Sequence, residues 1–167
     1  VKKLAQEGAT ESAELVTKSH LSLTGASGKV GLYYDVKNDE WYLPLGNAPS
    51  THIVKQSHVR LKNIVANEQL CLLMAKELGI EIPESFIVKT DGRNSEDVLF
   101  ATGRYDRKFT SHPGKLNGLS VPYRLHQEDF SQALGIPSSQ KYEQNGGDYL
   151  KRMFAILQNY SASPMED

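Results

Sequence analysis

Between residues 30 and 55, short runs of β-branched and aromatic residues alternate with polar turns. Val30 to Val36 predicts a strand, Lys37 to Glu40 predicts a hairpin turn, and Trp41 to Pro44 predicts the returning strand. A further extended run, Ser50 to Lys55, follows a break at Gly46 to Pro49. This order of elements is typical of an antiparallel β-meander.

The longest apolar repeat of helical period follows the meander. It runs from Asn63 to Leu78 and stops at Gly79, a residue type favoured in the position after a helix. Glu84 to Lys89 and Asp97 to Thr102 then alternate as two strands around an Asp91-Gly92 turn. The pattern therefore predicts one helix and one hairpin beside the meander.

The last third of the chain has a different character. Residues 110–123 are rich in Gly, Pro, Ser and Asn and predict a linker loop, whereas Gln127 to Leu134 and Asp148 to Gln158 have helical patterns. We therefore expect an α+β fold in four parts. These are a polar tail or frayed helix (1–18), a lobe of antiparallel sheet with one packed helix (19–109), the linker (110–123) and the start of a helical lobe (124–167).

Composition narrows the classes of function. The 167 residues are 39% hydrophobic, which suits a folded domain, and the formal net charge of −1 gives no general attraction for nucleic acid. The single cysteine, Cys71, favours a reducing compartment, so we expect a cytoplasmic protein. No apolar stretch approaches the roughly 18 to 20 residues of a membrane span. The five histidines show no ligand-like pairing with cysteine, so we expect no metal site.

A loop of small residues precedes the first strand. The backbone amides of Gly25 to Lys29 could close around phosphate oxygens, as a nest does. A Walker A loop would have Gly at position 23 and Ser or Thr at position 30, where Leu23 and Val30 stand, so the P-loop NTPase class is excluded. A glycine-containing hairpin turn is the plain alternative, and this loop alone leaves both interpretations open.

A lysine and a glutamate are expected on apolar faces. Alternation along the strand places Lys55 on the same face as Ile53. A rotation of about 100° per residue places Glu68 in an apolar stripe of the next helix, with Ile64, Cys71, Leu72, Ala75 and Leu78. Each charge is costly there without a partner, so we predict that Lys55 and Glu68 pair. Taken separately, they are more simply a solvated edge lysine and a rim glutamate.

A strand lysine that faces a helix glutamate is the arrangement by which protein kinases hold the phosphates of ATP. Gly103 to Arg107 directly follows the second hairpin strand, where a two-lobed kinase has the hinge that meets adenine. Its aromatic ring and backbone groups suit the face and edge of a purine. A charged loop with a packed tyrosine is an equally simple interpretation.

Seven motifs in this order and spacing resemble the HipA-like family of bacterial Ser/Thr protein kinases. They lie between residues 21 and 158 and comprise Ser22 to Lys29, Thr51 to Lys55, Asn67 to Gly79, Gly103 to Arg107, Arg124 to Phe130, Gln132 to Gly135, and Lys141 to Glu143 with Gly146-Gly147. The resemblance implies a kinase-like fold and transfer of the ATP γ-phosphate to a protein serine, with ATP and Mg²⁺ as cofactors. The family's best-known member is a toxin that targets an aminoacyl-tRNA synthetase and is restrained by a HipB antitoxin. A synthetase substrate and a HipB-like partner are therefore implied.

The resemblance also assigns candidate residues. Lys55 is implied to hold phosphates, with Glu68 as its helix partner. The implied phosphate loop contains Ser22, Thr24, Gly25, Ala26, Ser27, Gly28 and Lys29, and the implied adenine and ribose hinge contains Gly103, Arg104, Tyr105 and Asp106. The family's catalytic Asp and Asn and its metal-binding Asp lie C-terminal to the matched region. We therefore expect no catalytic residue or metal ligand here, and an inactive fragment of a longer kinase.

A function of another class stays open. In that interpretation the chain is a non-catalytic protein-interaction module, and the loop and Lys55 are merely structural. Nucleotide binding separates the two hypotheses.

Overall fold

The computed structural model of the protein describes residues 29–56, 63–89, 98–143 and 146–166. These residues belong to two compact units, one ending at Leu125 and the other beginning at His126. Each unit is described by itself below.

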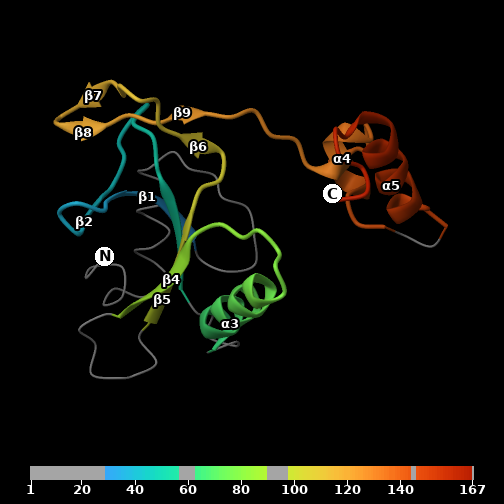
Figure 1. Ribbon diagram of the computed structural model, residues 1–167, viewed down its shortest axis with the longest axis horizontal. Coiled ribbons are helices and arrows are strands. Elements are labelled where there is room, and N and C mark those ends of the chain that lie inside the picture. Colours follow the sequence, from blue (N-terminus) through green and yellow to red (C-terminus); the bar gives the residue numbers. More distant parts are fainter. Residues whose placement is uncertain (1–28, 57–62, 90–97, 144–145, 167) are drawn as a thin grey trace. The chain divides into compact units, whose positions relative to one another are not determined.

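The first unit, which contains β1 and α3 in Figure 1, is built on a five-stranded antiparallel sheet. The strand order of the sheet is β2-β1-β3-β5-β4. Its strands are β1 (Lys29–Asp35), β2 (Glu40–Tyr42), β3 (His52–Gln56), β4 (Ser85–Lys89) and β5 (Val98–Gly103). The helix between β3 and β4 is α3 (Ile64–Glu77). The predicted meander, helix and pair of strands are thus confirmed, whereas the Asp91-Gly92 turn lies outside the described residues.

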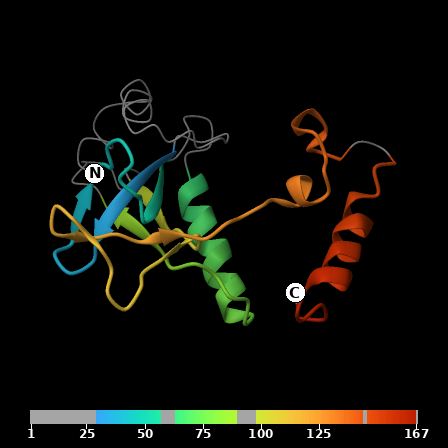
Figure 2. The same ribbon diagram turned by 90° about the horizontal axis from the view of Figure 1, so that it is seen from above.

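The two faces of the sheet carry different side chains because neighbouring residues of a strand point to opposite faces. One face forms the hydrophobic core, which contains the buried side chains of Val30, Leu32, Val54, Leu99 and Ala101. The other face carries Ile53, Lys55 and the fully buried Phe100. Helix α3 contacts β5 and β4, and Figure 2 shows it beside the sheet.

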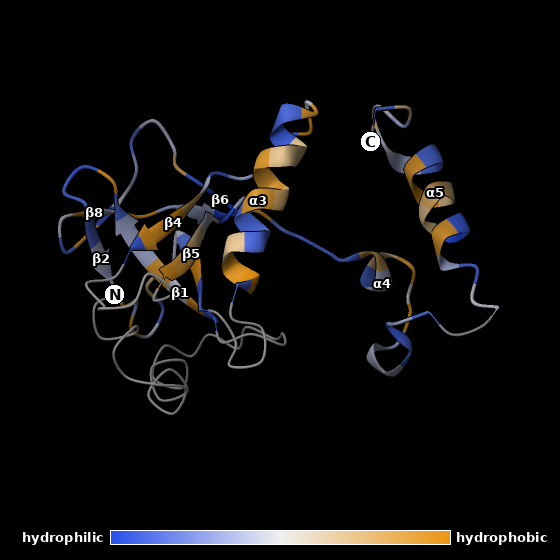
Figure 3. Ribbon diagram, turned by 90° about the horizontal axis from the view of Figure 1, so that it is seen from below, coloured by the Kyte–Doolittle hydropathy of each residue, from blue (hydrophilic) through white to orange (hydrophobic). Residues whose placement is uncertain are grey.

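Helix α3 ends where the sequence predicts, because Gly79 has a φ of +80°, a left-handed conformation that other residues adopt with strain. Its side chains that are at least partly buried include Val65, Glu68, Gln69 and Leu72, which recur at helical spacing. The predicted stripe was wrong at Cys71 and Leu78, which are exposed. Hydrophobic residues therefore also lie on the outer side of α3 (Figure 3), among them Leu70, Leu73 and Met74.

Short strands occupy part of the region predicted as a linker and the residues that flank it. Strand β6 (Arg107–Lys108) pairs with β9 (Tyr123–Arg124), and β7 (Lys115–Leu116) pairs with β8 (Leu119–Ser120). The turn between β7 and β8 is Asn117-Gly118, where both residues have positive φ angles, the conformation of the tight hairpin turns. The Tyr33 hydroxyl donates a hydrogen bond of 2.9 Å to the carbonyl of Ser120 and so ties the hairpin to β1.

The second unit contains α4 (Phe130–Ala133), a 3-10 turn at Ser138–Gln140, and α5 (Tyr149–Tyr160). Helix α4 is shorter than predicted, and it begins with a capping box between Asp129 and Gln132. Asp129 also accepts a hydrogen bond of 2.8 Å from Lys141, while Glu143 accepts one of 2.8 Å from the amide of Tyr149 at the start of α5. Polar contacts therefore hold the connection between the two helices.

Replacing Gly147 with alanine is expected to destabilise this unit. A Cβ atom at this position would lie 2.8 Å from the Tyr149 ring and 3.1 Å from the Cγ of Glu143. The Tyr149 ring cannot move freely because its hydroxyl donates to the carbonyl of Gln140 at 2.8 Å. Overpacking of this kind costs about 1 to 3 kcal/mol. Thermal unfolding followed by circular dichroism should show a lower midpoint for Gly147→Ala, with Gly114→Ala as the control because its added Cβ would have nothing within 4 Å.

Candidate functional site

Lys55 lies near the end of β3, on the same face of the sheet as α3. Its Nζ forms an ion pair with Oε1 of Glu68 and lies 5.4 Å from the centre of the Phe100 ring. The two charged side chains are 22% and 34% exposed, so the pair is partly desolvated and still open to solvent. The predicted pairing of Lys55 with Glu68 is therefore confirmed.

This geometry leaves the lysine able to bind an anion. An ammonium group has three N–H donors and Glu68 accepts from one of them, so the group can donate to a further acceptor while it keeps its partner. The Phe100 ring adds an apolar surface with a negative face beside the cation. An anionic oxygen that approaches Lys55 would meet a cation already fixed in place.

The predicted phosphate loop adjoins this lysine. Lys29, its last residue, begins β1, and its Cα is the register partner of Lys55 on β3. The other six members of the loop (Ser22, Thr24, Gly25, Ala26, Ser27 and Gly28) lie outside the described residues, and their phosphate-binding role stays a prediction.

The predicted hinge begins at the last residue of β5. The amide of Gly103 donates to the carbonyl of Glu84 at 2.8 Å, and the amide of Arg104 donates to the carbonyl of Thr51 at 2.8 Å. These two donors are therefore used within the fold. The side chain of Tyr105 is 72% exposed, so its ring is accessible for stacking against a flat ligand.

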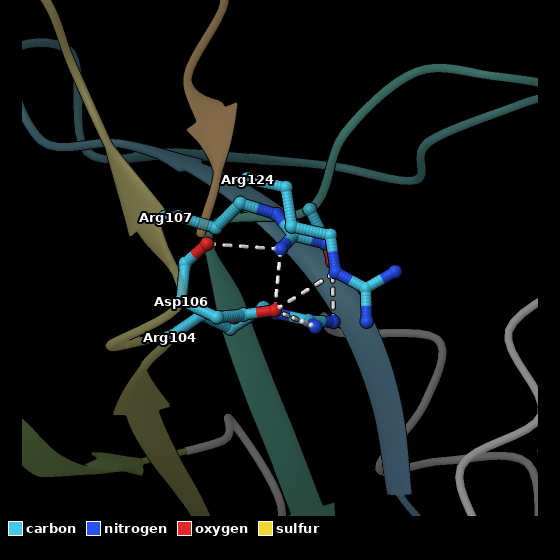
Figure 4. Close-up of polar contacts among 5 residues, drawn as sticks. Arg104, Asp106, Arg107 and Arg124 are labelled. Atoms are coloured by element: carbon cyan, nitrogen blue, oxygen red, sulfur yellow. Dashed lines mark hydrogen bonds and ion pairs between the residues drawn. The ribbon is translucent and has the colours of Figure 1, made fainter. Parts of the chain in front are cut away.

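Asp106 is the centre of a cluster of charges (Figure 4). Its buried carboxylate accepts two hydrogen bonds of 2.8 Å from Arg104 and one of 2.5 Å from Arg107. Nε of Arg124, on β9, lies 3.5 Å from the same carboxylate. Arg104 also donates to the Ser50 hydroxyl at 3.2 Å. The cluster joins the end of β5, strand β6, strand β9 and the loop before β3.

The neighbouring arginines favour the ionised form of the Asp106 carboxyl group. Hydrogen bonds from Arg104, with the charges of Arg104 and Arg107, hold the pKa of Asp106 below its ordinary value, although burial acts in the opposite direction. Three guanidinium groups surround one carboxylate, so the cluster carries an excess of positive charge. The Asp106 side chain is committed to these arginines, and its predicted contact with ribose stays a prediction.

A cavity of about 570 Å³ borders the hinge. Its lining includes Gly103, Arg104, Arg107, the aromatic rings of Tyr34 and Phe109, and His52. The His52 ring is 7% exposed, accepts or donates a hydrogen bond of 2.9 Å with the Thr51 hydroxyl, and contacts Tyr34 edge to face. Side chains of both charges line the cavity, because Asp35 and Glu84 also border it. Its His52 wall belongs to the face of the sheet opposite Lys55, since the two residues are three positions apart on β3.

Acid is expected to destabilise the first unit through His52. Burial lowers the pKa of His52 below its ordinary value, and the charge of Glu84 offsets this only in part. The unfolded state therefore binds more protons than the folded state below about pH 6.5, so stability falls as the pH falls through that value. Urea unfolding at pH 7.5 and 5.5 measures the loss. His52→Gln should show a smaller loss between the two pH values than the wild type, and an equal loss would contradict the assignment.

Several groups of this site were missed by the sequence analysis. Arg107 and Arg124 are register partners on β6 and β9, so their approach depends on a strand pair that was not predicted.

Within the described part of the chain, no group of three or more His, Cys, Asp or Glu side chains could hold a metal ion. Nor is any described helix long and apolar enough to cross a membrane.

Comparisons with known proteins identify the class to which this fold belongs. The chain superposes on the solved structure of the Shewanella oneidensis HipA, HipB and operator DNA complex with a TM-score of 0.60 and 30% identity, over 83% of this chain and 32% of that chain. The HipA-like C-terminal domain family matches residues 21–167. The chain therefore belongs to the HipA-like C-terminal domain family.

Sequence relatives agree with this assignment. The chain is 34% identical over 147 residues to the putative kinase Y4mE of Sinorhizobium fredii. This alignment covers 88% of this chain and 32% of the relative. It is 35% identical over 130 residues to the serine/threonine-protein kinase toxin HipA of Shewanella oneidensis, covering 78% of this chain and 27% of that protein. The chain thus spans about a third of the length of the curated relatives it matches.

Proposed function

We propose that the chain is the ATP-binding part of a HipA-like serine/threonine protein kinase, with a kinase-like N-terminal lobe of sheet and helix followed by the start of a helical lobe. The observation that carries this proposal is the ion pair between Lys55 on β3 and Glu68 on α3. A fixed lysine of this kind positions the phosphates of a nucleotide in protein kinases. The kinase names of the relatives support the same class of function.

The sheet register sets the orientation of the nucleotide. His52 on β3 is paired with Gly103, the first hinge residue, and Lys55 follows three residues later along the strand. At about 3.3 Å per residue, the hinge and the lysine are about 10 Å apart along β3. An extended ATP molecule can span this distance. The adenine then meets Gly103 to Asp106 and the phosphates meet Lys55, with Ile53 on the floor between them.

We further propose that this chain binds ATP without transferring its phosphate. Phosphoryl transfer requires a metal held by carboxylates and an oriented acceptor hydroxyl, and Mg²⁺, when bound, neutralises charge on the phosphates. Lys55 and the hinge supply only binding and orientation. The catalytic Asp, the Asn and the metal-binding Asp implied by the family resemblance lie beyond the matched motifs.

We propose that the intact kinase phosphorylates a protein serine, with an aminoacyl-tRNA synthetase as substrate and a HipB-like antitoxin as partner.

A phosphotransfer assay tests whether the chain lacks the phosphate transfer that we propose for the intact kinase. The chain and the full-length Shewanella oneidensis HipA toxin are incubated in parallel with Mg²⁺ and ATP that carries ³²P in the γ-phosphate, and labelled protein is counted. We expect label on the full-length kinase, and no label above background on this chain. A rate of self-labelling near that of the full-length kinase would contradict the proposal.

The protein-interaction alternative has one observation in its favour. The outer side of α3 exposes Leu70, Leu73 and Met74, each about half accessible to solvent. Exposed apolar side chains at helical spacing can bind another protein. Binding of ATP that depends on Lys55 would favour the kinase function, because a purely structural lysine has no influence on a nucleotide.

A further inference from the structure

Three buried oxygen atoms lie between α3 and the sheet without a hydrogen-bond partner. Among the residues that the structure describes, these are the Gln69 Oε1, the Ser85 Oγ and the Thr102 Oγ1. Ser85 and Thr102 are register partners on β4 and β5, so their side chains share one face of the sheet. That face is the α3 face, since Phe86, the residue after Ser85, packs on the hydrophobic core at the opposite face.

Gln69 reaches the same place from the helix. Its Nε2 lies 3.4 Å from the carbonyl of Ser85, at the long limit of a hydrogen bond, and its Oε1 is bonded to the same side-chain carbon. One amide oxygen and two hydroxyl groups therefore converge from α3, β4 and β5. A buried polar group without a partner costs about 1 to 3 kcal/mol, so three such groups in one place call for a shared partner.

The rotation of α3 also needs an explanation beyond hydrophobic burial. Val65 is the only buried residue of α3, while Leu70, Leu73 and Met74 on other sides of the helix are exposed. Apolar residues thus lie on both the inner and the outer side of α3, and their burial alone does not select one rotation. Glu68 and Gln69 are adjacent in the sequence, so any rotation that displaces Gln69 also displaces Glu68 from Lys55.

We propose that Gln69, Ser85 and Thr102 bind one buried water molecule and that this polar cluster holds α3 in the rotation that pairs Glu68 with Lys55. A water molecule suits the site because buried waters typically make about three hydrogen bonds to groups that otherwise lack partners. The hydroxyl groups can donate or accept, and the amide oxygen accepts. The three residues are positioning residues, since they act on a nucleotide only through Glu68 and Lys55.

The sign of a stability change tests the water site. If the hydroxyls bond a shared water, Thr102→Val and Ser85→Ala should each lower the folding equilibrium constant about fivefold, which is the effect of one hydrogen bond. The double variant should lose little more than either single variant, because both hydroxyls contact the same water. Thr110→Val, at an exposed position, is the control and should change little. If the hydroxyls lack a partner, both variants should be more stable than the wild type, which would overturn the proposal.

The positioning role rests on the proposed function and needs a second readout. Calorimetric titration of the wild type and Ser85→Ala with ATP and with adenosine should show ATP affinity reduced several-fold and adenosine affinity unchanged. Equal losses for both ligands, or no loss for ATP, would overturn the positioning role. If the wild type binds neither ligand, the proposed function fails, whereas the stability data still decide whether the water site exists.

Discussion

Replacing Asp106 with asparagine is expected to destabilise the first unit by about 3 kcal/mol, because it removes the carboxylate that pairs with two largely buried arginines. The side chains of Arg104 and Arg107 are 12% and 11% exposed, so water cannot replace the lost charge. Asparagine keeps the size and one acceptor oxygen, and the loss therefore reports mainly the charge. Urea unfolding at neutral pH measures the change in the free energy of unfolding.

An exposed aspartate provides the matched control for this substitution. Asp129 pairs with Lys141 at 2.8 Å, but the two side chains are 46% and 48% exposed. Asp129→Asn should destabilise the protein much less than Asp106→Asn does, because solvent screens an exposed ion pair and asparagine also caps a helix. Similar losses in the free energy of unfolding for Asp106→Asn and Asp129→Asn would show that the arginine cluster stabilises the fold no more than an exposed ion pair does.

Acid should act on the same cluster at lower pH than on His52. The pKa of Asp106 is depressed in the folded protein, chiefly by the hydrogen bonds from Arg104. Its contribution to stability is therefore present above the pKa of the unfolded state, about 3.9, and is lost as the pH falls through the lower folded value. In urea unfolding below about pH 4, the stability of the wild type should approach that of Asp106→Asn.

Replacing Lys55 with methionine is expected to lower the affinity for ATP by about 10-fold or more while leaving the affinity for adenosine unchanged. A hydrogen bond to a charged group contributes about 1.5 to 3 kcal/mol, which corresponds to this range of affinity. Adenosine has no phosphate to contact the lysine. Glu68→Gln should have a smaller effect in the same direction, because it leaves the cation in place but removes its fixed partner.

A lysine on α3 controls for the general loss of positive charge. Lys76 lies in the last turn of α3 and is exposed. Lys76→Met should bind ATP as the wild type does. Calorimetric titration of the three variants therefore separates a specific contact from nonspecific attraction, and equal losses at Lys55 and Lys76 would count against the phosphate site.

Much of the fold could be predicted from local patterns. Alternation identified the strands of the sheet, and the apolar repeat that stops at Gly79 identified α3. The hairpin of β7 and β8 was missed although Asn117-Gly118 is a strong turn signal. The strands that flank this turn have two residues each, too few to show alternation. The Gly, Pro, Ser and Asn content of this segment therefore predicts a linker rather than strands.

The candidate site was predictable where the local sequence pattern around each residue indicated its position. Lys55 and Glu68 could be paired because each was expected on an apolar face. The grouping of Arg104, Arg107 and Arg124 around Asp106 could not be predicted, since it depends on the contact between β6 and β9. The same holds for Gln69, whose neighbours Ser85 and Thr102 come from separate strands. Such clusters follow from tertiary structure, which short sequence patterns do not specify.

In the proposed function, Lys55 contacts the phosphates of bound ATP. Labelling with an acyl phosphate of ATP probes this contact, because this reagent transfers its acyl group to a lysine beside the bound phosphates. We expect mass spectrometry to find the acyl group on Lys55. Excess ATP should block this labelling, excess adenosine should block it less, and Lys76 should be labelled only at background level. Labelling of Lys55 that equals that of Lys76 and is unaffected by ATP would show that Lys55 does not contact the phosphates.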